Sequence, residues 1–189
     1  MSHKLNGNET VLEQDEAALR PRSTTAAEQS PLVMRFGGFG DMVLLTILLR
    51  HLYERFGKPV DLISSGAWTQ PLLAGQPWLG RLYLIRSRRT PYLLSLDQRR
   101  LVSSLRQRVA GPTWFCDLGL GFDLLERGGI PSGYICDDRE FKWRPDECVA
   151  DRYIRLGNET PADLVGKLPP PRPASPSRRS CCNRAPSGI

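Results

Sequence analysis

The sequence predicts a domain of the α/β class with a parallel sheet, and three observations support this assignment. Short apolar runs typical of buried strands recur through the middle of the chain, helix-sized intervals separate them, and a glycine-rich loop follows the first run. Strands that alternate with helices in this order form right-handed βαβ crossovers and therefore a parallel sheet. We expect this domain over 31–166, between a flexible leader over 1–30 and a disordered tail over 167–189 that is rich in Pro, Arg and Ser.

The first strand and the loop after it are the most informative part of the chain. A buried strand is predicted over 32–36, and Gly37, Gly38 and Gly40 then allow a tight turn without Cβ atoms. Asp41 follows where a helix should begin, close to unpaired N–H groups and to the positive end of the helix dipole. The loop is therefore expected to hold an oriented carboxylate.

A helix is predicted over 41–56, because apolar residues recur there at helical spacing. Val43, Ile47 and Leu48 are expected near its buried stripe, and Gly57 stands where a helix C-terminal glycine belongs. This helix would connect the first strand to the second.

The remaining elements continue the alternation of strands and helices. Each predicted strand is short and apolar, and the intervals between strands leave room for a crossover. Further strands are predicted over 60–64, 82–85, 114–118 and 132–136, and further helices over 93–109 and 148–156.

Positive charge is concentrated in two segments of the chain. The formal net charge is +6, but Lys167 and four arginines follow position 166 with no acid, so the rest of the chain is nearly neutral. We therefore expect no nucleic-acid partner. Seven arginines lie between Arg86 and Arg108, enough to bind an anionic partner such as a phosphorylated glycolipid; a solvated helix face is the alternative.

The motifs of several common sites are missing from the sequence. The five cysteines form no C-x-x-C pair, so the sequence has no zinc signature. We expect neither a metal nor a cofactor. Val43 stands where a dinucleotide-binding loop that starts at Gly38 needs its third glycine, and no G-K-[ST] sequence follows. A carboxylate at Asp41 would also repel a pyrophosphate. The loop is better suited to present a carboxylate to a neutral group such as a hydroxyl.

The location of the protein is predicted from what its apolar segments can do. No apolar run reaches the length of about 18 residues that a transmembrane helix needs. The leader lacks the apolar core of a secretory signal. We expect a cytoplasmic protein.

The segment RFGGFGDMVLLTILLR, over 35–50, resembles the opening of the ADP-heptose:lipopolysaccharide heptosyltransferases, which form glycosyltransferase family 9. This first segment is the most specific part of the resemblance. Weaker similarity to later landmarks of the family is found over 60–65, 71–83 and 150–156, and the resemblance as a whole covers 31–168.

Members of this family are two-domain enzymes with the GT-B fold. Their Rossmann-like N-terminal half binds the acceptor and their C-terminal half binds the nucleotide sugar, and this chain matches only the N-terminal half. The resemblance implies that Asp41 is the catalytic general base and that Gly37, Gly38, Phe39 and Gly40 bind substrate. A helix cap is the structural alternative for Asp41.

The function implied by the resemblance is transfer of a sugar from a nucleotide-sugar donor to a lipopolysaccharide-core or related glycan acceptor. The implied partners are a glycan or glycolipid acceptor, a nucleotide-sugar donor only where a second domain is supplied, and the inner membrane surface as a peripheral contact. The composition changes abruptly near Leu168, so we expect a truncated or frame-shifted enzyme that is inactive alone. A non-catalytic acceptor-binding fragment and, less favoured, a small Rossmann oxidoreductase are the alternatives.

Overall fold

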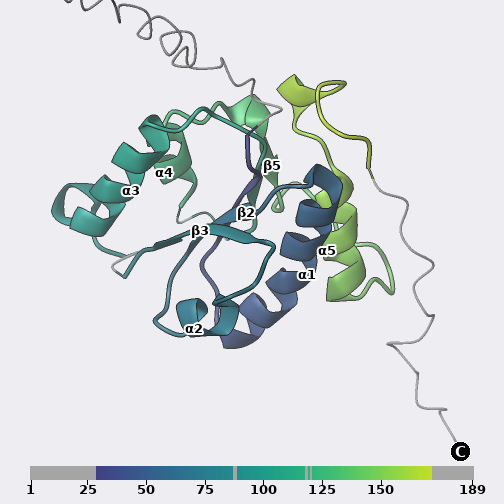
Figure 1. Ribbon diagram of the computed structural model, residues 1–189, viewed down its shortest axis with the longest axis horizontal. Coiled ribbons are helices and arrows are strands. Elements are labelled where there is room, and N and C mark those ends of the chain that lie inside the picture. Colours follow the sequence, from purple (N-terminus) through teal and green to yellow (C-terminus); the bar gives the residue numbers. More distant parts are fainter. Residues whose placement is uncertain (1–28, 87–88, 118, 120, 172–189) are drawn as a thin grey trace, which may run out of the picture.

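A computed structural model of the chain describes residues 29–86, 89–117, 119 and 121–171. Its centre is a five-stranded sheet of parallel strands in the order β3-β2-β1-β4-β5 (Figure 1). This confirms the predicted α/β class and its Rossmann-like parallel sheet. Most of the predicted leader and tail lies outside the described residues. The strands are β1 Leu32–Arg35, β2 Val60–Ser64, β3 Leu79–Leu84, β4 Thr113–Phe115 and β5 Ile135–Asp137.

Helices cover both faces of the sheet (Figure 1). The first face packs against α1 (Phe39–Phe56), α2 (Thr69–Leu73) and α5 (Val149–Asn158). The second face packs against α3 (Leu96–Arg106) and α4 (Phe122–Arg127). Three short 3₁₀ turns complete the described chain: η3 Tyr92–Leu94, η4 Ser132–Tyr134 and η5 Ala162–Leu164.

Alternation along the strands builds two separate cores. Val33 and Trp114 belong to the cluster under α1 and α5, whereas Leu32, Met34 and Phe115 belong to the cluster under α3 and α4. Successive side chains of a strand point to opposite faces, so a strand covered by helices on both sides is apolar throughout. This is why the central strands are continuous apolar runs in the sequence.

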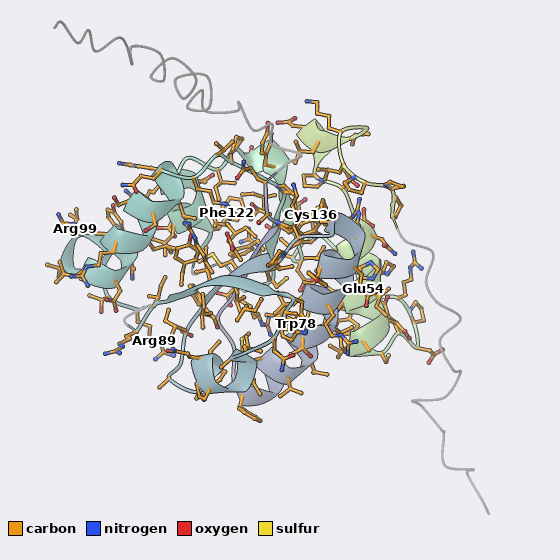
Figure 2. The ribbon with its side chains drawn as sticks, in the orientation of Figure 1. Glu54, Trp78, Arg89, Arg99, Phe122 and Cys136 are labelled. Atoms are coloured by element: carbon orange, nitrogen blue, oxygen red, sulfur yellow. The ribbon has the colours of Figure 1, made fainter. Side chains whose placement is uncertain are left out.

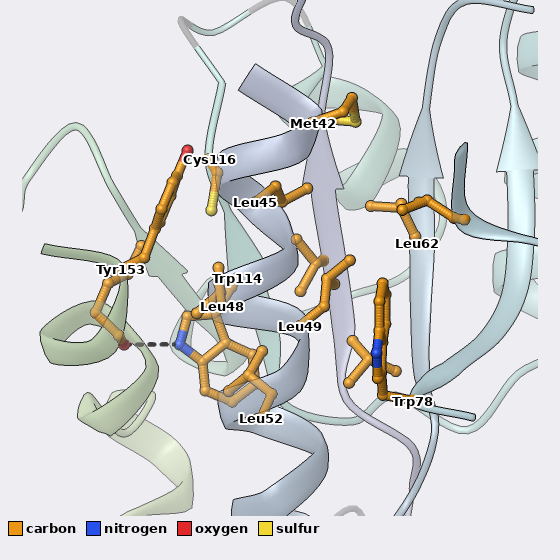
Figure 3. Close-up of a cluster of buried hydrophobic side chains, with 14 residues drawn as sticks. Met42, Leu45, Leu48, Leu49, Leu52, Leu62, Trp78, Trp114, Cys116 and Tyr153 are labelled. Carbon is orange, nitrogen blue, oxygen red and sulfur yellow. Dashed lines mark hydrogen bonds between the residues drawn. The ribbon is translucent and has the colours of Figure 1, made fainter. Parts of the chain in front are cut away.

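The buried stripe of α1 agrees with the prediction at Leu48 but not at Val43 and Ile47. Its fully buried side chains recur at intervals of three and four residues, while Val43 is exposed and Ile47 is only partly buried. The helix is apolar on nearly all sides in its first half, so spacing alone could not show which side faces the sheet. The buried stripe consists of Met42, Leu45, Leu48, Leu49 and Leu52 (Figure 3).

One tryptophan and one arginine fix α1, β4 and α5 to one another. Trp114 Nε1 donates to the Leu156 carbonyl at 3.0 Å, across the cluster drawn in Figure 3. Arg55, near the end of α1, is buried, and its Nη1 donates to the carbonyls of Gly157 and Glu159, both at 2.8 Å. The same guanidinium donates from Nη2 to Thr160 Oγ1 at 2.9 Å. The carboxyl-terminal part of the described chain is thereby held against the Rossmann-like domain.

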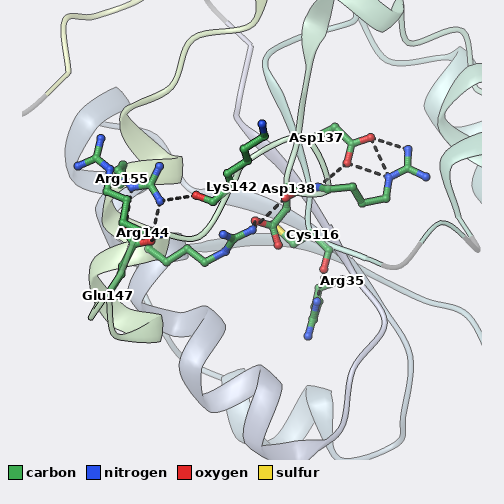
Figure 4. Close-up of polar contacts among 10 residues, drawn as sticks. Arg35, Cys116, Asp137, Asp138, Lys142, Arg144, Glu147 and Arg155 are labelled. Carbon is green, nitrogen blue, oxygen red and sulfur yellow. Dashed lines mark hydrogen bonds and ion pairs between the residues drawn. The ribbon is translucent and has the colours of Figure 1, made fainter. Parts of the chain in front are cut away.

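A second polar network holds the start of α5 (Figure 4). Glu147 accepts from Arg155 Nε at 2.7 Å and from Arg155 Nη2 at 2.6 Å. This two-point contact lowers the pKa of the Glu147 carboxyl to about 2. Arg152, also on α5, pairs with Asp138 at 2.5 Å just after β5. The network links α5 to the edge of the sheet.

The order of the strands creates a topological switch point between β1 and β4. The chain moves outward in one direction from β1 to β3, and then returns to the other side of β1 as β4. In open α/β sheets of this kind, ligands bind outside the carboxyl ends of the strands at that point. The glycine loop leaves the carboxyl end of β1, so it lies at this position.

Candidate functional site

A cleft of about 640 Å³ opens at the switch point. The loop after β1 contributes Gly37, Gly38 and Asp41 to its wall. The end of β4 contributes Asp117, and residues beyond β2 and β3 complete the rim. The cleft therefore collects side chains that follow four neighbouring strands.

Asp41 is held in one orientation by two hydrogen bonds. Its Oδ2 accepts from the Gly38 backbone N–H at 2.7 Å, and its Oδ1 accepts from Arg35 Nη2 at 3.0 Å. The bond from Gly38, followed by the contact with Arg35, lowers the pKa of the Asp41 carboxyl. The side chain nevertheless remains 43% exposed. Asp41 thus caps the helix and also presents an ionised carboxylate to the cleft, so the cap and the candidate base are compatible roles.

Arg35 connects Asp41 to the sheet. It stands at the end of β1 and its Nη1 also donates to the carbonyl of Cys116, just after the neighbouring strand β4 (Figure 4). Its Nε is enclosed by protein and has no hydrogen-bond partner. The position of the Asp41 carboxylate is consequently tied to the pairing of β1 with β4.

The glycines of the loop have different roles. A Cβ at position 37 would lie 2.6 Å from the Cβ of Asp41, whereas a Cβ at position 38 would meet Asp41 Oδ2 at 3.6 Å. A Cβ at position 40 would meet nothing within 4 Å. Close approach therefore requires glycine only at Gly37. Gly37 and Gly38 line the cleft, while Phe39 and Gly40 are not among its lining residues, and their contact with substrate stays a prediction.

Asp117 is a further acid of the cleft that the sequence pattern did not single out. The residue is only 6% exposed, and its Oδ2 is enclosed without a hydrogen-bond partner. It comes two positions after the end of β4, as Asp41 comes shortly after the end of β1. The available sequence evidence was its place at the carboxyl end of a predicted strand next to the switch point.

The rim of the cleft is cationic and aromatic. Arg86 and Arg89, which follow β3, line it together with Trp68, which follows β2 (Figure 2 labels Arg89). Gly66 has a φ of 100°, and a Cβ there would lie 2.6 Å from the Trp68 ring. The ring also contacts Phe39 edge to face, with centroids 6.1 Å apart. The close approach of Gly66 thus allows an indole to stand at the mouth of the cleft.

These side chains suit some ligands better than others. The Gly38 N–H, which a pyrophosphate would need at the start of α1, already binds the Asp41 carboxylate. The charge of that carboxylate would repel a phosphate at the same position. A neutral hydroxyl could instead donate to Asp41, while Arg86 and Arg89 could bind an anionic group farther out. The described residues contain no group of three or more His, Cys, Asp or Glu side chains placed to hold a metal ion.

Comparison with known proteins identifies no family for this chain. No family model, no curated protein and no solved structure matches this chain.

Proposed function

We propose that the cleft is the acceptor site of a glycosyltransferase of the heptosyltransferase type, and that Asp41 is its general base. The chain would form the acceptor-side half of a GT-B enzyme. The observation that carries this proposal is the Asp41 carboxylate, fixed by Gly38 and Arg35 and still open to the cleft. A base must stand at a defined position within hydrogen-bond reach of the group it deprotonates.

The proposed step is an inverting displacement. The acceptor hydroxyl oxygen bonds to the anomeric carbon of the donor sugar, the bond from that carbon to the nucleoside diphosphate breaks, and the hydroxyl proton passes to Asp41. The lowered pKa of Asp41 ensures that it is deprotonated at neutral pH. It is a weak base, but the hydroxyl proton becomes acidic as its oxygen attacks, which is when a carboxylate can accept it.

The charge and shape of the rim favour an acidic glycan as the acceptor. Arg86 and Arg89 are exposed at the cleft and form no ion pair with any described residue. Guanidinium groups bind phosphates and carboxylates through paired hydrogen bonds. The indole of Trp68 offers a flat apolar surface on which a sugar ring could rest. A phosphorylated or carboxylated core oligosaccharide combines these features.

A donor half would have a surface on which to dock. Phe39, Val43 and Leu44 are exposed on the first turns of α1, and Phe39 contacts Trp68 at the rim of the cleft. Burial of such apolar side chains is the usual driving force for domain association. A second domain placed there would close the cleft over the two reacting sugars.

The experiment that tests the acceptor site is a calorimetric titration of the chain. Deacylated lipid A carrying Kdo serves as the acceptor and ADP-heptose as the donor. We expect the acceptor to bind and the donor not to bind. The double variant Arg86→Gln/Arg89→Gln should weaken acceptor binding about tenfold or more, since two charge contacts are lost. Arg50→Gln/Arg81→Gln removes the same charge away from the cleft and should leave the affinity unchanged.

Two outcomes of the titration would overturn the proposal. Binding of ADP-heptose to this chain would place the nucleotide site within these residues and reverse the division of roles. Equal affinity of both double variants for the acceptor would remove the cleft as its site.

A non-catalytic acceptor-binding fragment would share this cleft, and turnover separates the two functions. With the donor half of a heptosyltransferase supplied as a separate polypeptide, the catalytic proposal predicts product from the wild-type chain. It predicts no product from Asp41→Asn, which keeps the shape of the side chain but cannot accept the proton. Product from both chains would contradict the role of Asp41.

A further inference from the structure

A second cavity, of about 530 Å³, lies toward the amino ends of the strands, whereas the cleft lies at their carboxyl ends. It is bordered by β2, β3, the end of α3 and the residues just before β1 (Figure 1). The two hollows share no lining residue. The polar side chains that line the second cavity include Asp61, Arg81, Tyr83, Ser104, Gln107 and Arg108.

The end of α3 supplies one wall of the second cavity. The helix packs on the sheet through Leu101, Val102 and Leu105, whereas Ser104 and Gln107 are exposed and line the cavity. Like the other helices in the described part of the chain, α3 lacks the length and apolar content needed to cross a bilayer. The wall is thus the polar end of a helix whose other side is anchored in the core.

Charged side chains form the opposite wall, on a sheet face that is otherwise apolar. Ile63 and Tyr83 belong to the cluster under α3 and α4, and Asp61, two positions before Ile63, points to the same face. Arg81 lines the cavity beside it. A buried ion pair adds little stability compared with apolar residues of the same volume. Charges at this place are therefore better explained by a ligand than by folding.

The pairing of β2 with β3 is irregular at this wall. From Val60 to Leu62, β2 advances two residues while the paired part of β3 advances three. Such bulges redirect side chains and are common beside binding sites. Asp61 Oδ1 accepts from the Arg81 N–H at 2.8 Å, and a Cβ at Gly80 would lie 2.5 Å from that oxygen. The extra residue and the glycine thus fix Asp61 and Arg81 next to each other.

Asp61 also holds the inner arginine of the cavity. Its Oδ2 lies 3.4 Å from Arg108 Nη1, and both side chains are nearly enclosed. Arg108 Nη2 donates to the Ser30 carbonyl. Burial is the main cause that lowers the pKa of the Arg108 guanidinium; Asp61 opposes this effect and the nearby charge of Arg81 adds to it. The two guanidinium groups are therefore close enough to repel each other.

The second cavity has more positive charge and more donors than its own residues use. Two arginines and one aspartate leave a formal charge of +1, and both oxygens of Asp61 are already engaged within the wall. Arg81 is exposed and forms no ion pair with a described residue. The side chains of Tyr83, Ser104 and Gln107 make no hydrogen bond to any residue that the structure describes. These groups are available to an anion.

We infer that the second cavity binds a small phosphate compound, either inorganic phosphate or a small phosphomonoester. Its oxygens would accept from Arg81 and the neutral donors and would offset the repulsion between Arg81 and Arg108. A carboxylate has only two oxygens and would leave more of these donors unused. The volume is typical of sites for small molecules. The inference does not rest on the proposed transferase function.

Titration of the full chain with inorganic phosphate, at neutral pH and constant ionic strength, tests this inference. ¹H–¹⁵N NMR spectra show which part of the chain responds. We expect the backbone signals of Arg81, Ser104 and Gln107 to shift and to saturate. Glycerol 3-phosphate is titrated in the same way: tighter binding than phosphate identifies a phosphomonoester as the ligand, and weaker binding identifies free phosphate.

Matched variants separate this site from general attraction of anions. Arg81→Gln should weaken phosphate binding at least about tenfold, since a charged donor is lost. Ser104→Ala should weaken it about two- to tenfold, through the loss of one neutral hydrogen bond. Arg50→Gln removes an exposed charge elsewhere and should bind as the wild type does. Arg86→Gln/Arg89→Gln alters the cleft and should leave the shifts in the second cavity unchanged.

Three results would overturn the inference. The first is a wild-type chain in which the signals of the second cavity do not shift with phosphate. The second is an Arg81→Gln chain, folded by its NMR spectrum, that binds phosphate as tightly as the Arg50→Gln chain. The third is acetate that binds the second cavity as tightly as phosphate does, because a carboxylate would then satisfy the site equally well.

Discussion

Substitution of Gly37 by alanine tests how the cleft positions its carboxylate. The added Cβ would lie 2.6 Å from the Cβ of Asp41 and 2.8 Å from its Oδ2. Carbon atoms in contact prefer about 3.5–4.0 Å, so the overlap is about 1 Å. Rotation of the Asp41 side chain does not move its Cβ, so the start of α1 has to shift. We expect Gly37→Ala to destabilise the fold by about 1–3 kcal/mol, as overpacked sites do.

The neighbouring glycines supply controls of the same chemistry. A Cβ at Gly38 would meet Asp41 Oδ2 at an ordinary distance of 3.6 Å, so Gly38→Ala should cost less than about 1 kcal/mol, mainly through its helix-capping position. A Cβ at Gly40 would meet nothing within 4 Å, and this residue lies in the first turn of α1. Gly40→Ala should stabilise the fold by up to about 1 kcal/mol, because alanine is the better helix former.

Urea denaturation at neutral pH, followed by circular dichroism, gives the free energy of unfolding of each variant. The expected order of stability is Gly40→Ala at or above the wild type, then Gly38→Ala, then Gly37→Ala. Thermal unfolding should follow with a change in Tm of about 2–4 °C per kcal/mol. A Gly37→Ala chain as stable as Gly38→Ala would refute the close contact between Gly37 and Asp41.

Three further predictions concern the rest of the domain. Arg55→Met leaves several carbonyl groups without their donor and should destabilise the fold by about 3 kcal/mol. Arg50→Met, at an exposed position of the same helix, should change the unfolding free energy by less than about 0.5 kcal/mol. Equal losses of the two variants in urea denaturation would contradict the Arg55 network. Arg155 lowers the pKa of Glu147 from 4.5 to about 2, so the stability gained from this pair is present above the ordinary pKa and is lost as the pH falls toward 2. Glu147→Gln should remove that part of the pH dependence, and an unchanged slope would exclude the pair as its source. Burial raises the pKa of the Cys116 thiol well above its usual value, so iodoacetamide should modify it only after unfolding, and mass spectrometry of the folded chain showing rapid alkylation would contradict its burial.

Strands buried along their whole length could be located closely from the sequence. β2, Val60–Ser64, is buried at every position and has the bounds that its apolar run predicted. β3 lies at an edge of the sheet and begins at Leu79, before the predicted start at position 82. Gly80 and Arg81 are exposed and interrupt the apolar pattern there. Burial does not fix every boundary, since β4 is buried throughout and still ends at Phe115, before the predicted end at position 118.

Short helices were missed for a related reason. α2 has five residues and α4 has six, and neither extends far enough to show a helical period. The expected strand over 132–136 is a 3₁₀ turn followed by β5, which begins at Ile135, so the predicted strand starts too early. The helix expected over 93–109 is shorter, Leu96–Arg106, because Ser95 caps it.

The candidate site could be predicted where its residues are neighbours in the sequence. Gly37, Gly38 and Asp41 are adjacent, so their loop and helix start could be recognised directly. The contact from Arg35 to the Cys116 carbonyl joins positions 81 residues apart and depends on the pairing of β1 with β4. The place of Asp117 in the cleft depends on the same pairing. Such tertiary contacts leave no local pattern in the sequence.

The measurement that most directly tests Asp41 as the acceptor-side base is the ¹³C NMR signal of its carboxyl carbon, assigned by its loss in Asp41→Asn. The proposal predicts that this signal shifts when deacylated lipid A carrying Kdo saturates the chain, because an acceptor hydroxyl then donates to the carboxylate. It predicts no shift with ADP-heptose. A signal that stays in place with bound acceptor, or that moves with the donor alone, would contradict the role proposed for Asp41.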